Sequence, residues 1–444
     1  MAAVQTGIRD DRVNAATVLV VVVCWLAIIF EGYDLIVYGT VVPSLLHDKA
    51  WSLNPAQAGA IGSYAVIGML FGALIVGTLT DFVGRKVTLV SCVALFSLAM
   101  GGCALAPTPA LFSILRFIAG LGLGGVIPTA TAVTIEYAPR KWRTLTYTVM
   151  FSGYSLGGII AAGLAIPLIP AFGWRIMFWI GVVPLVLVVP VALFFLPESI
   201  GFLLAKGRRE EAEIIAHRFN LHLDTAVQPV TERWSVLKTL FARRVLLATI
   251  SFWIATFLAL FMIFGLNTWV PQIMRTAGYS LGSALSFLLV LDIGTIIGSL
   301  FTGAAMDRFG ARSTCTVSFL LAAFSLGLLS VRLPLPVTYI LFAIAGVGTI
   351  GTQTLLNAYV SKYYPLSSRA TALGWSLGIG RLGGILGPLF GGALLAWGVG
   401  LQWNFYAFAL PGLLGAIVIL FVNDRHASDF ARAESNGTPV FLPE

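Results

Sequence analysis

The hydrophobic and polar positions of this 444-residue chain alternate in long blocks. Predominantly apolar stretches of about 18 residues or more, the length that a helix needs to cross a bilayer, recur along it. Short polar stretches separate them. The pattern predicts twelve membrane-spanning helices, at about 17–43, 56–79, 87–106, 109–136, 145–170, 174–196, 245–271, 281–306, 314–331, 335–360, 370–396 and 403–422.

Two other interpretations of these apolar runs do not fit. A transmembrane β-barrel alternates apolar and polar residues over strands of about ten residues, and this chain lacks that alternation. The first run is too long for a signal peptide and has no small-residue cleavage site, so we expect it to remain in the mature protein. The expected fold class is an all-α integral membrane protein.

The composition agrees with a membrane location. Hydrophobic residues make up 58% of the chain and charged residues only 10%, against about 25% charged residues in a soluble domain. The net charge of +8 is the excess of 27 Lys and Arg over 19 Asp and Glu residues. Most of the Lys and Arg residues lie in segments on the same side as the N-terminus. The outer loops hold Lys49, Arg175, Arg275 and Arg332. The positive-inside rule therefore predicts that both termini are cytoplasmic, and nucleic-acid binding is not expected.

An internal repeat divides the chain. The stretch "GTLTDFVGRK" at 77–86 recurs as "GAAMDRFGAR" at 303–312, an offset of 226 residues. The same offset relates Gly68 to Gly294, Gly72 to Gly298, Tyr137 to Tyr363, Pro139 to Pro365 and Arg143 to Arg369. Such repeats mark transporters whose halves enclose a central site. We expect an N-terminal six-helix half at 1–196, a cytoplasmic linker at 197–244 with a short amphipathic helix, a C-terminal half at 245–422 and a cytoplasmic tail at 423–444.

The first copy of this loop resembles a family signature. "GTLTDFVGRK" is similar to G-x-L-x-D-x-x-G-R-[KR], which the major facilitator superfamily carries at this place. The twelve spans and the repeat extend the resemblance over nearly the whole chain. It implies the major facilitator fold, with twelve transmembrane helices in two pseudo-symmetric halves, and transport by alternating access.

Residues of the two loops are candidates for gating. Gly77 is expected to let two helices approach closely, and Asp81 to cap a helix N-terminus of the other half or pair with a nearby arginine. Asp307, with Arg369 nearby, is expected to do the same in the second half. Such bonds would hold the inner face shut until it opens. The alternative is that the basic residues of the motif only enforce topology. The gating candidates are Gly77, Asp81, Gly84, Arg85, Lys86, Arg143, Asp307 and Arg369.

Acidic residues inside the spans are costly, at about 2.5–3.5 kcal/mol each near a helix centre. Glu31 and Asp34 are three residues apart, and Tyr38 extends the helical face that they share. A carboxylate pair in a poorly solvated place can exchange a proton near neutral pH. We interpret Glu31, Asp34 and Asp292 of the eighth span as proton-coupling residues. The alternative is neutralisation by an Arg from the other half, with a structural role only.

Arg381 is a basic residue near the middle of the eleventh span. Its repeat mate is Ser155, so a fixed positive charge breaks the symmetry of the halves at this place. Because a guanidinium offers a planar fork that fits a carboxylate, we expect Arg381 to bind an anionic substrate. An ion pair with Asp34 or Asp292 is the alternative. Arg116 of the fourth span is expected nearer the outer end of its helix.

The same stretches narrow the resemblance. "EGYD" at 31–34 is similar to the D-G-x-D motif of the aromatic acid:proton symporter family, with Glu31 where that family usually has Asp. "GWSLGIGRLGGILGP" and "LNAYVSKYYPLSSRATALGW" also resemble that family. The resemblance implies a bacterial inner-membrane symporter that imports benzoate-like acids with protons. The residues expected to bind substrate are Arg381, Tyr154, Tyr38, Asp34 and Asn357.

Other transport functions are weighed against this one. Another organic anion, nicotinate-like or dicarboxylic, remains open. Drug:proton exporters carry G-x-x-x-G-P-x-x-G-G in span five, where this chain reads "GYSLGGIIAAG" without the Pro. "PESIGFLLAKGRREEA" resembles an inner-loop motif of sugar and organic-ion carriers, but a mid-membrane Arg suits an anion better than a neutral sugar. A transport-dead sensor of aromatic acids also remains open.

Enzyme chemistry, metals and cofactors are not expected. The sequence has no His or Cys set with metal-ligand spacing and no nucleotide-binding loop. Its four Cys lie in or beside apolar spans without paired spacing, so they are expected to be packing residues. The expected partners are a small aromatic carboxylate, a proton and the lipid bilayer, and the protein is expected to be a monomer.

Overall fold

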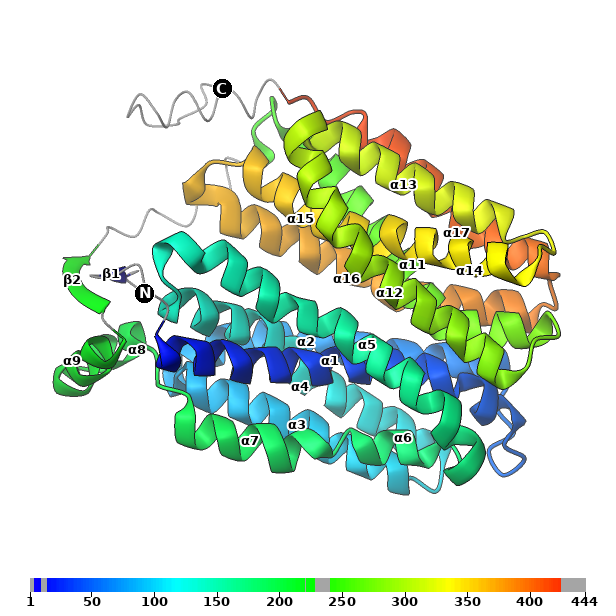
Figure 1. Ribbon diagram of the computed structural model, residues 1–444, viewed down its shortest axis with the longest axis horizontal. Helices are drawn as coiled ribbons and strands as arrows, with labels where there is room; N and C mark the ends of the chain where they lie inside the picture. The colour runs from blue at the N-terminus through cyan, green and yellow to red at the C-terminus, as the bar shows by residue number, and fades with distance from the viewer. Residues whose placement is uncertain (1–3, 9–13, 220, 228–239, 425–444) are drawn as a thin grey trace. The chain divides into compact units, whose positions relative to one another are not determined.

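The computed structural model describes residues 4–8, 14–219, 221–227 and 240–424, and these residues are mostly helical (Figure 1). Within them, twelve helical segments are long and apolar enough to cross a membrane. The predicted fold class and number of spans are therefore confirmed.

The first six spans begin close to the predicted residues. They are α1 (Ala15–His47), α2 (Pro55–Val83), α3 (Arg85–Leu105), α4 (Pro109–Tyr137), α5 (Arg143–Phe172), and a sixth span made of α6 (Arg175–Ile180) and α7 (Val183–Phe195). A short 3₁₀ turn, η1 (Arg140–Trp142), precedes α5. Pro184, in the first turn of α7, lacks the N–H that would continue the helix from α6, so the sixth span is broken there.

The last six spans contain one irregular helix. They are α11 (Leu246–Thr276), α12 (Leu281–Phe309), α13 (Ala311–Leu328), a tenth span made of α14 (Leu335–Gly346), the π-helical turn η2 (Val347–Gly351) and α15 (Thr352–Tyr363), then α16 (Leu366–Ala396) and α17 (Leu401–Ile419). Single π-helical turns inside α-helices often mark functional segments. This one lies directly before the polar residues of α15.

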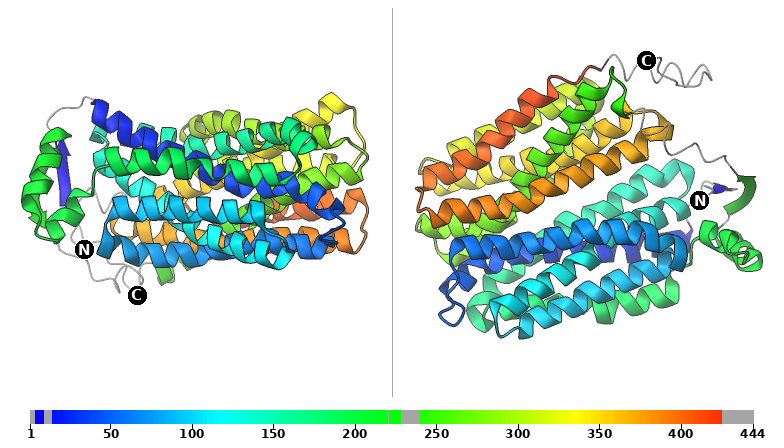
Figure 2. Two further views of the ribbon diagram at one scale, coloured as in Figure 1. Left: turned by 90° about the horizontal axis from the view of Figure 1, so that it is seen from below. Right: turned by 180° about the vertical axis from the view of Figure 1, so that it is seen from behind.

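The linker region holds two short helices, α8 (Ile200–Ala205) and α9 (Arg209–Arg218), and a strand pair. The amphipathic helix predicted in the linker is confirmed as α9. Its Arg209 pairs with Glu213 at 2.9 Å, and just before it Arg208 pairs with Glu211, a hydrogen-bonded carboxylate that raises the pKa of Arg208 above its ordinary value. Strands β1 (Val4–Ile8) and β2 (Leu221–Val227) pair antiparallel, which the sequence does not predict. Figure 2 shows α9 and the strands at one end of the neighbouring long helices.

The chain divides into two compact units. Unit 1 comprises residues 1–44 and 64–230, and unit 2 comprises residues 45–63 and 231–444. The short segment 45–63 joins unit 2 because Ser63 Oγ donates a hydrogen bond of 2.6 Å to the carbonyl of Ile385, and Gly59 lies against the backbone of Pro388. In unit 1, a hydrophobic core extends from α1, α3 and α4 to α8 and α9.

Candidate functional site

A buried ion pair joins two spans of unit 1. Asp34 on α1 pairs with Arg116 on α4, and each side chain is only 1% exposed. Arg116 Nη2 also donates to the carbonyl oxygen of Asp34 at 3.3 Å, and its guanidinium lies 5.8 Å from the centre of the Tyr38 ring. A buried pair needs such additional contacts to offset the loss of water. The structure thus brings Asp34 and Tyr38, both predicted site residues, to a shared cation.

Arg116 is not among the site residues that the sequence predicts. The alternative to proton coupling was neutralisation by an arginine of the other half, whereas Asp34 obtains its partner within unit 1. The rule that a charge inside a span needs a nearby opposite charge could have pointed to Arg116. Both side chains can form a further hydrogen bond, because Asp34 Oδ2 and Arg116 Nε have no hydrogen-bond partner among the described residues.

Glycines bring α1 and α5 into backbone contact beside the two acids of α1. A Cβ added to Gly32 would collide with the backbone of Tyr154, and one added to Gly157 would collide with the carbonyl of Ile29. The crossing places Tyr154, a predicted substrate residue, next to the segment that carries Glu31, which is completely buried. The glycine of the "EGYD" stretch is thus explained by helix packing.

In unit 2, Arg381 lies on a helix whose backbone is fixed by close packing. Cβ atoms added to Gly383 or Gly387 of α16 would collide with carbonyls of α11, and Thr256 of α11 shares a hydrogen bond of 2.7 Å with Ser376 of α16. Arg381 itself is half-buried. The Arg381 side chain is therefore attached to a rigid part of the helix. A residue that orients a substrate needs such a fixed backbone.

Asp292 on α12 is completely buried, and neither of its carboxylate oxygens has a hydrogen-bond partner among the described residues. A hydrogen-bonded ion pair between Arg381 and Asp292, one alternative for both residues, is therefore absent from unit 2. Since an ionised carboxylate without donors is costly in an apolar interior, this environment supports proton exchange at Asp292. Its coupling role stays a prediction.

Asn357 belongs to a pair of amides that follows the π-helical turn η2. Gln353 Nε2 donates to Asn357 Oδ1 at 2.9 Å, one helical turn away on α15. Gln353 is buried, and its Oε1 has no hydrogen-bond partner in the described part of the chain. Gln353 is not among the predicted site residues, although two amides four residues apart in an apolar span are a signal for it.

The loop between α2 and α3 is held by two carboxylates to which the sequence gives no role. Glu198 Oε1 accepts hydrogen bonds from the backbone N–H groups of Arg85, at 2.7 Å, and Lys86, at 3.2 Å. Gly84 has φ of 93°, and a Cβ there would overlap the Glu198 carboxylate. The Arg85 side chain pairs with Glu136 at the end of α4. Glu198 thus caps the positive N-terminus of α3.

Three other gating candidates of unit 1 are Gly77, Asp81 and Arg143. The side chain of Asp81 falls outside the described residues. Within its own unit, nothing described lies within 4 Å of the place that a Cβ would take on Gly77, so the expected close helix approach is not made there. Arg143 Nε donates to the carbonyl of Ala138 at 3.4 Å. Their gating roles stay predictions.

The corresponding loop of unit 2 carries a different ion pair from the one expected. Asp307 pairs with Lys362 at 2.9 Å, whereas Arg369 Nε has no hydrogen-bond partner among the described residues. The physical reason is that Lys362 lies in the last turn of α15, which contacts α12, the helix that carries Asp307. Nearby, Tyr364 shares a hydrogen bond of 2.6 Å with Thr249. Burial raises the pKa of Tyr364 to about 12, so it stays neutral.

Two stretches match the esterase pattern G-x-S-x-G, at 153–157 and 374–378. Both lie inside continuous helices, α5 and α16, whereas a catalytic serine of this class needs a strand–turn–helix elbow. Among the described residues, no group of three His, Cys, Asp or Glu is placed to hold a metal ion. The four cysteines are buried and free, as expected of packing residues.

Comparison with known proteins decides the family. Residues 24–295 and 290–443 match the Major Facilitator Superfamily model. The chain is a member of the major facilitator superfamily. Membership of this superfamily makes the protein a transporter and not an enzyme, and it agrees with the twelve spans and the loop motif.

Individual relatives extend over nearly the whole chain. The benzoate transport protein of Acinetobacter baylyi is 40% identical over 95% of this chain and 93% of its own length. The gentisate transporter of Corynebacterium glutamicum is 41% identical over 93% of this chain and 88% of its own length. A structure of the E. coli xylose transporter XylE, partially occluded and inward open, superposes with a TM-score of 0.73 at 19% identity, over 92% of this chain and 98% of that one. The similarity to XylE, at 19% identity, shows the fold alone.

Proposed function

We propose that the protein imports small aromatic carboxylates, such as benzoate or a hydroxybenzoate, together with protons and by alternating access. The observation that carries this proposal is the pair of relatives at 40% and 41% identity. Both are named for transport of an aromatic acid, and both align over almost their full length. A protein this similar throughout its spans supports the same substrate class, while the particular acid depends on a few side chains.

Arg381 is the proposed partner of the substrate carboxylate. A charge-assisted bidentate hydrogen bond contributes about 1.5–3 kcal/mol, or roughly 10- to 150-fold in affinity. Tyr154, Tyr38 and Asn357 are proposed to contact the aromatic ring and its substituents. The rigid packing of α16 against α11 supports this role, because a fixed backbone limits the positions of the guanidinium.

Proton coupling is proposed to use Glu31, Asp34 and Asp292. The ion pair between Asp34 and Arg116 suggests how a proton could act: a proton bound to Asp34 would remove the charge that holds Arg116 and loosen α1 from α4. Proton binding and this change in the helix pair would favour each other reciprocally. Asp292, buried without donors, is proposed as a second proton-binding group.

The arrangement in the membrane is part of the proposal. Halves at 1–196 and 245–422, a linker at 197–244 and a tail at 423–444 would place both termini in the cytoplasm of a bacterium, with the protein as a monomer in the inner membrane. The excess of Lys and Arg in the segments on the N-terminal side supports this orientation. Gating by the two repeat-related loops belongs to the same scheme.

Uptake of radiolabelled benzoate and gentisate into proteoliposomes tests the substrate class and direction. We expect accumulation driven by an inside-alkaline pH gradient and its loss with a protonophore. Competition by nicotinate, a dicarboxylate, xylose and benzamide ranks the alternatives. Stronger competition by one of the first three, or gradient-driven efflux of benzoate, would refute the proposed import of aromatic acids.

Variants then separate binding from coupling. Arg381→Ala should weaken binding of benzoate far more than that of benzamide, while Arg381→Lys should bind benzoate at an intermediate level. Asp34→Asn and Asp292→Asn should lose gradient-driven accumulation but keep benzoate exchange, because exchange needs no net proton release. Equal losses for acid and amide would assign Arg381 to helix packing, and normal accumulation in both Asn variants would exclude these acids from coupling.

A further inference from the structure

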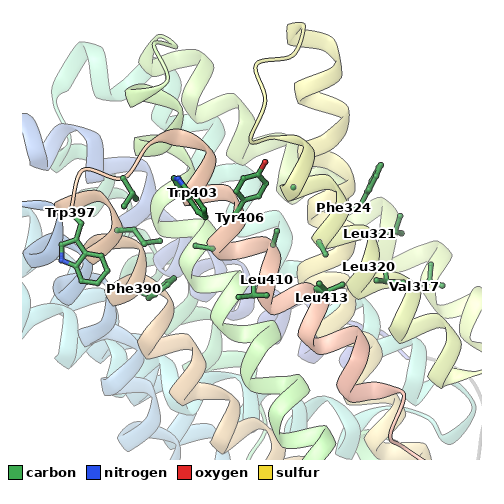
Figure 3. A pocket seen from close by; sticks show the side chains of 16 residues that line it. Val317, Leu320, Leu321, Phe324, Phe390, Trp397, Trp403, Tyr406, Leu410 and Leu413 are labelled. Carbon is green, nitrogen blue, oxygen red and sulfur yellow. The ribbon is translucent and has the colours of Figure 1, made fainter.

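A long apolar groove lies on the surface of unit 2. It has a volume of about 1140 Å³ and runs along α17 between α13 and α16 (Figure 3). Its sides include Leu320 and Phe324 of α13, Phe390 and Leu394 of α16, and Leu410 of α17. None of the described residues that line it is charged, and on α13 and α17 they extend over several helical turns. The groove therefore follows the direction of the spans.

We propose that this groove binds one acyl chain of a membrane phospholipid. Its walls belong to helices that are long and apolar enough to cross the bilayer, so hydrocarbon is the medium that meets them. An extended peptide would leave its backbone N–H and C=O groups without partners against these walls, which is costly inside a bilayer. The groove is also separate from Asp292, Arg381 and Asn357, so the proposal does not depend on which acid is transported.

The aromatic residues at one end give the groove a direction. Trp397 and Trp403 flank the short turn between α16 and α17 and are 73% and 66% exposed, and Tyr406 lies one helical turn further along α17. Trp and Tyr gather where a bilayer meets water, because their rings are apolar and their N–H or O–H groups are polar. This end matches the glycerol and headgroup of a phospholipid, and the purely apolar remainder matches its chain.

The shape of the rims favours a lipid over a second copy of the protein. Helices associate in membranes through small residues that let their backbones approach. Small residues, Ala323 and Gly327, do line this groove, but large exposed rings, Phe324 on one side and Trp397 on the other, project beside it. They would hold a neighbouring helix away, whereas a thin and flexible acyl chain passes between them.

One glycine offers a way to fill the groove without disturbing the fold. Gly327 lines it near the end of α13, and no atom of the described residues beyond its own stretch of helix lies within 4 Å of the place that a Cβ would take there. Gly327→Phe should therefore occupy the space of several methylene groups. Because each buried methylene contributes about fourfold to partition, we expect about tenfold or greater loss of bound chain. Ala110→Phe, at an exposed position of α4 in unit 1, is the matched control.

The test is photo-crosslinking in proteoliposomes that contain phosphatidylethanolamine with a diazirine on the acyl chain. Crosslinked peptides are mapped by mass spectrometry, and uptake of labelled benzoate checks that each variant is folded. We expect crosslinks concentrated on α13, α16 and α17 at the groove, in excess of those at exposed Ile114 or Phe194. This excess should fall about tenfold in Gly327→Phe and persist in Ala110→Phe.

Three outcomes would overturn the proposal. Labelling spread evenly over the lipid-facing side chains would mean that lipid does not stay in the groove for longer than at the rest of the surface. Equal labelling of wild type and Gly327→Phe would place the chain elsewhere. Protein–protein crosslinks through the groove, found with a diazirine amino acid at Phe324, would make its occupant a second copy of the chain.

Discussion

The loops after α2 and α12 occupy equivalent places in the repeat but are held by different interactions. Both turn at a glycine with positive φ, 93° at Gly84 and 84° at Gly310. In unit 1 the paired side chains of Arg85 and Glu136 are 33% and 11% exposed. In unit 2 the paired side chains of Lys362 and Asp307 are 61% and 75% exposed. Equivalent backbone geometry thus supports a shielded clamp in one unit and a solvated contact in the other.

The difference follows from an exchange of charge between repeat mates. Glu136 of unit 1 corresponds to Lys362 of unit 2 at the offset of 226. Glu198, which caps α3, corresponds to Asp424, which instead accepts a hydrogen bond from Tyr359. The two loops therefore share the glycine turn but differ in the side-chain contacts that hold it. We infer that the loop of unit 1 is the stiffer of the two, and that the loop of unit 2 opens more readily.

The largest expected difference comes from the two turn glycines. Gly84→Ala and Gly310→Ala both force a Cβ into a left-handed conformation, at about 1 kcal/mol. Only at Gly84 does the Cβ also displace the Glu198 carboxylate from the backbone of α3, which costs about 1–3 kcal/mol more. Thermal unfolding in detergent, followed with a dye that reacts with the four buried cysteines, should show the larger loss for Gly84→Ala. Equal losses of thermal stability in the two variants would mean that the Glu198 carboxylate does not stabilise the loop of unit 1.

The ion pairs provide the next comparison. Arg85→Gln leaves the shielded carboxylate of Glu136 without its cation and should lower stability by about 2–3 kcal/mol. Lys362→Gln breaks an exposed pair and should change stability by about 0–1 kcal/mol. The same melting assay measures both, and benzoate uptake shows whether the clamp matters for transport.

A double variant checks the origin of the larger effect. Glu136→Gln combined with Arg85→Gln removes both charges and should regain most of the stability that Arg85→Gln alone loses. A double variant as unstable as the sum of the two single variants would mean that the two side chains do not act as a pair.

The smallest expected effect is that of the tyrosines that end α4 and α15. Tyr137 donates to the carbonyl of Glu198 at 2.6 Å, whereas its repeat mate Tyr363 donates to the carbonyl of Asn423 at 3.3 Å. Tyr137→Phe should cost about 1 kcal/mol and Tyr363→Phe less, because a longer hydrogen bond is weaker. A larger loss for Tyr363→Phe would contradict the view that unit 1 is fastened more firmly.

The sequence predicts those features that depend on local composition and period. The number of spans, the helix α9 and the loop motif all follow from short stretches read by themselves. The polar partners do not, because they join distant segments. Arg116 meets Asp34 across 82 residues, and Glu198 meets Arg85 across 113 residues. No periodicity reports which spans become neighbours, so the sequence can point to Arg116 as a cation inside a span but cannot assign it to Asp34.

The glycine crossing of α1 and α5 has a consequence for how such a transporter can diversify. Position 32 lies between Glu31 and Asp34, yet any side chain there would meet the backbone of Tyr154. A substitution of Gly32 would disrupt the helix crossing whatever the substrate. Adaptation to a new substrate therefore has to use the residues around position 32. In a library randomised at 31–34 and selected for growth on an unfamiliar acid, survivors should share Gly32 and differ beside it.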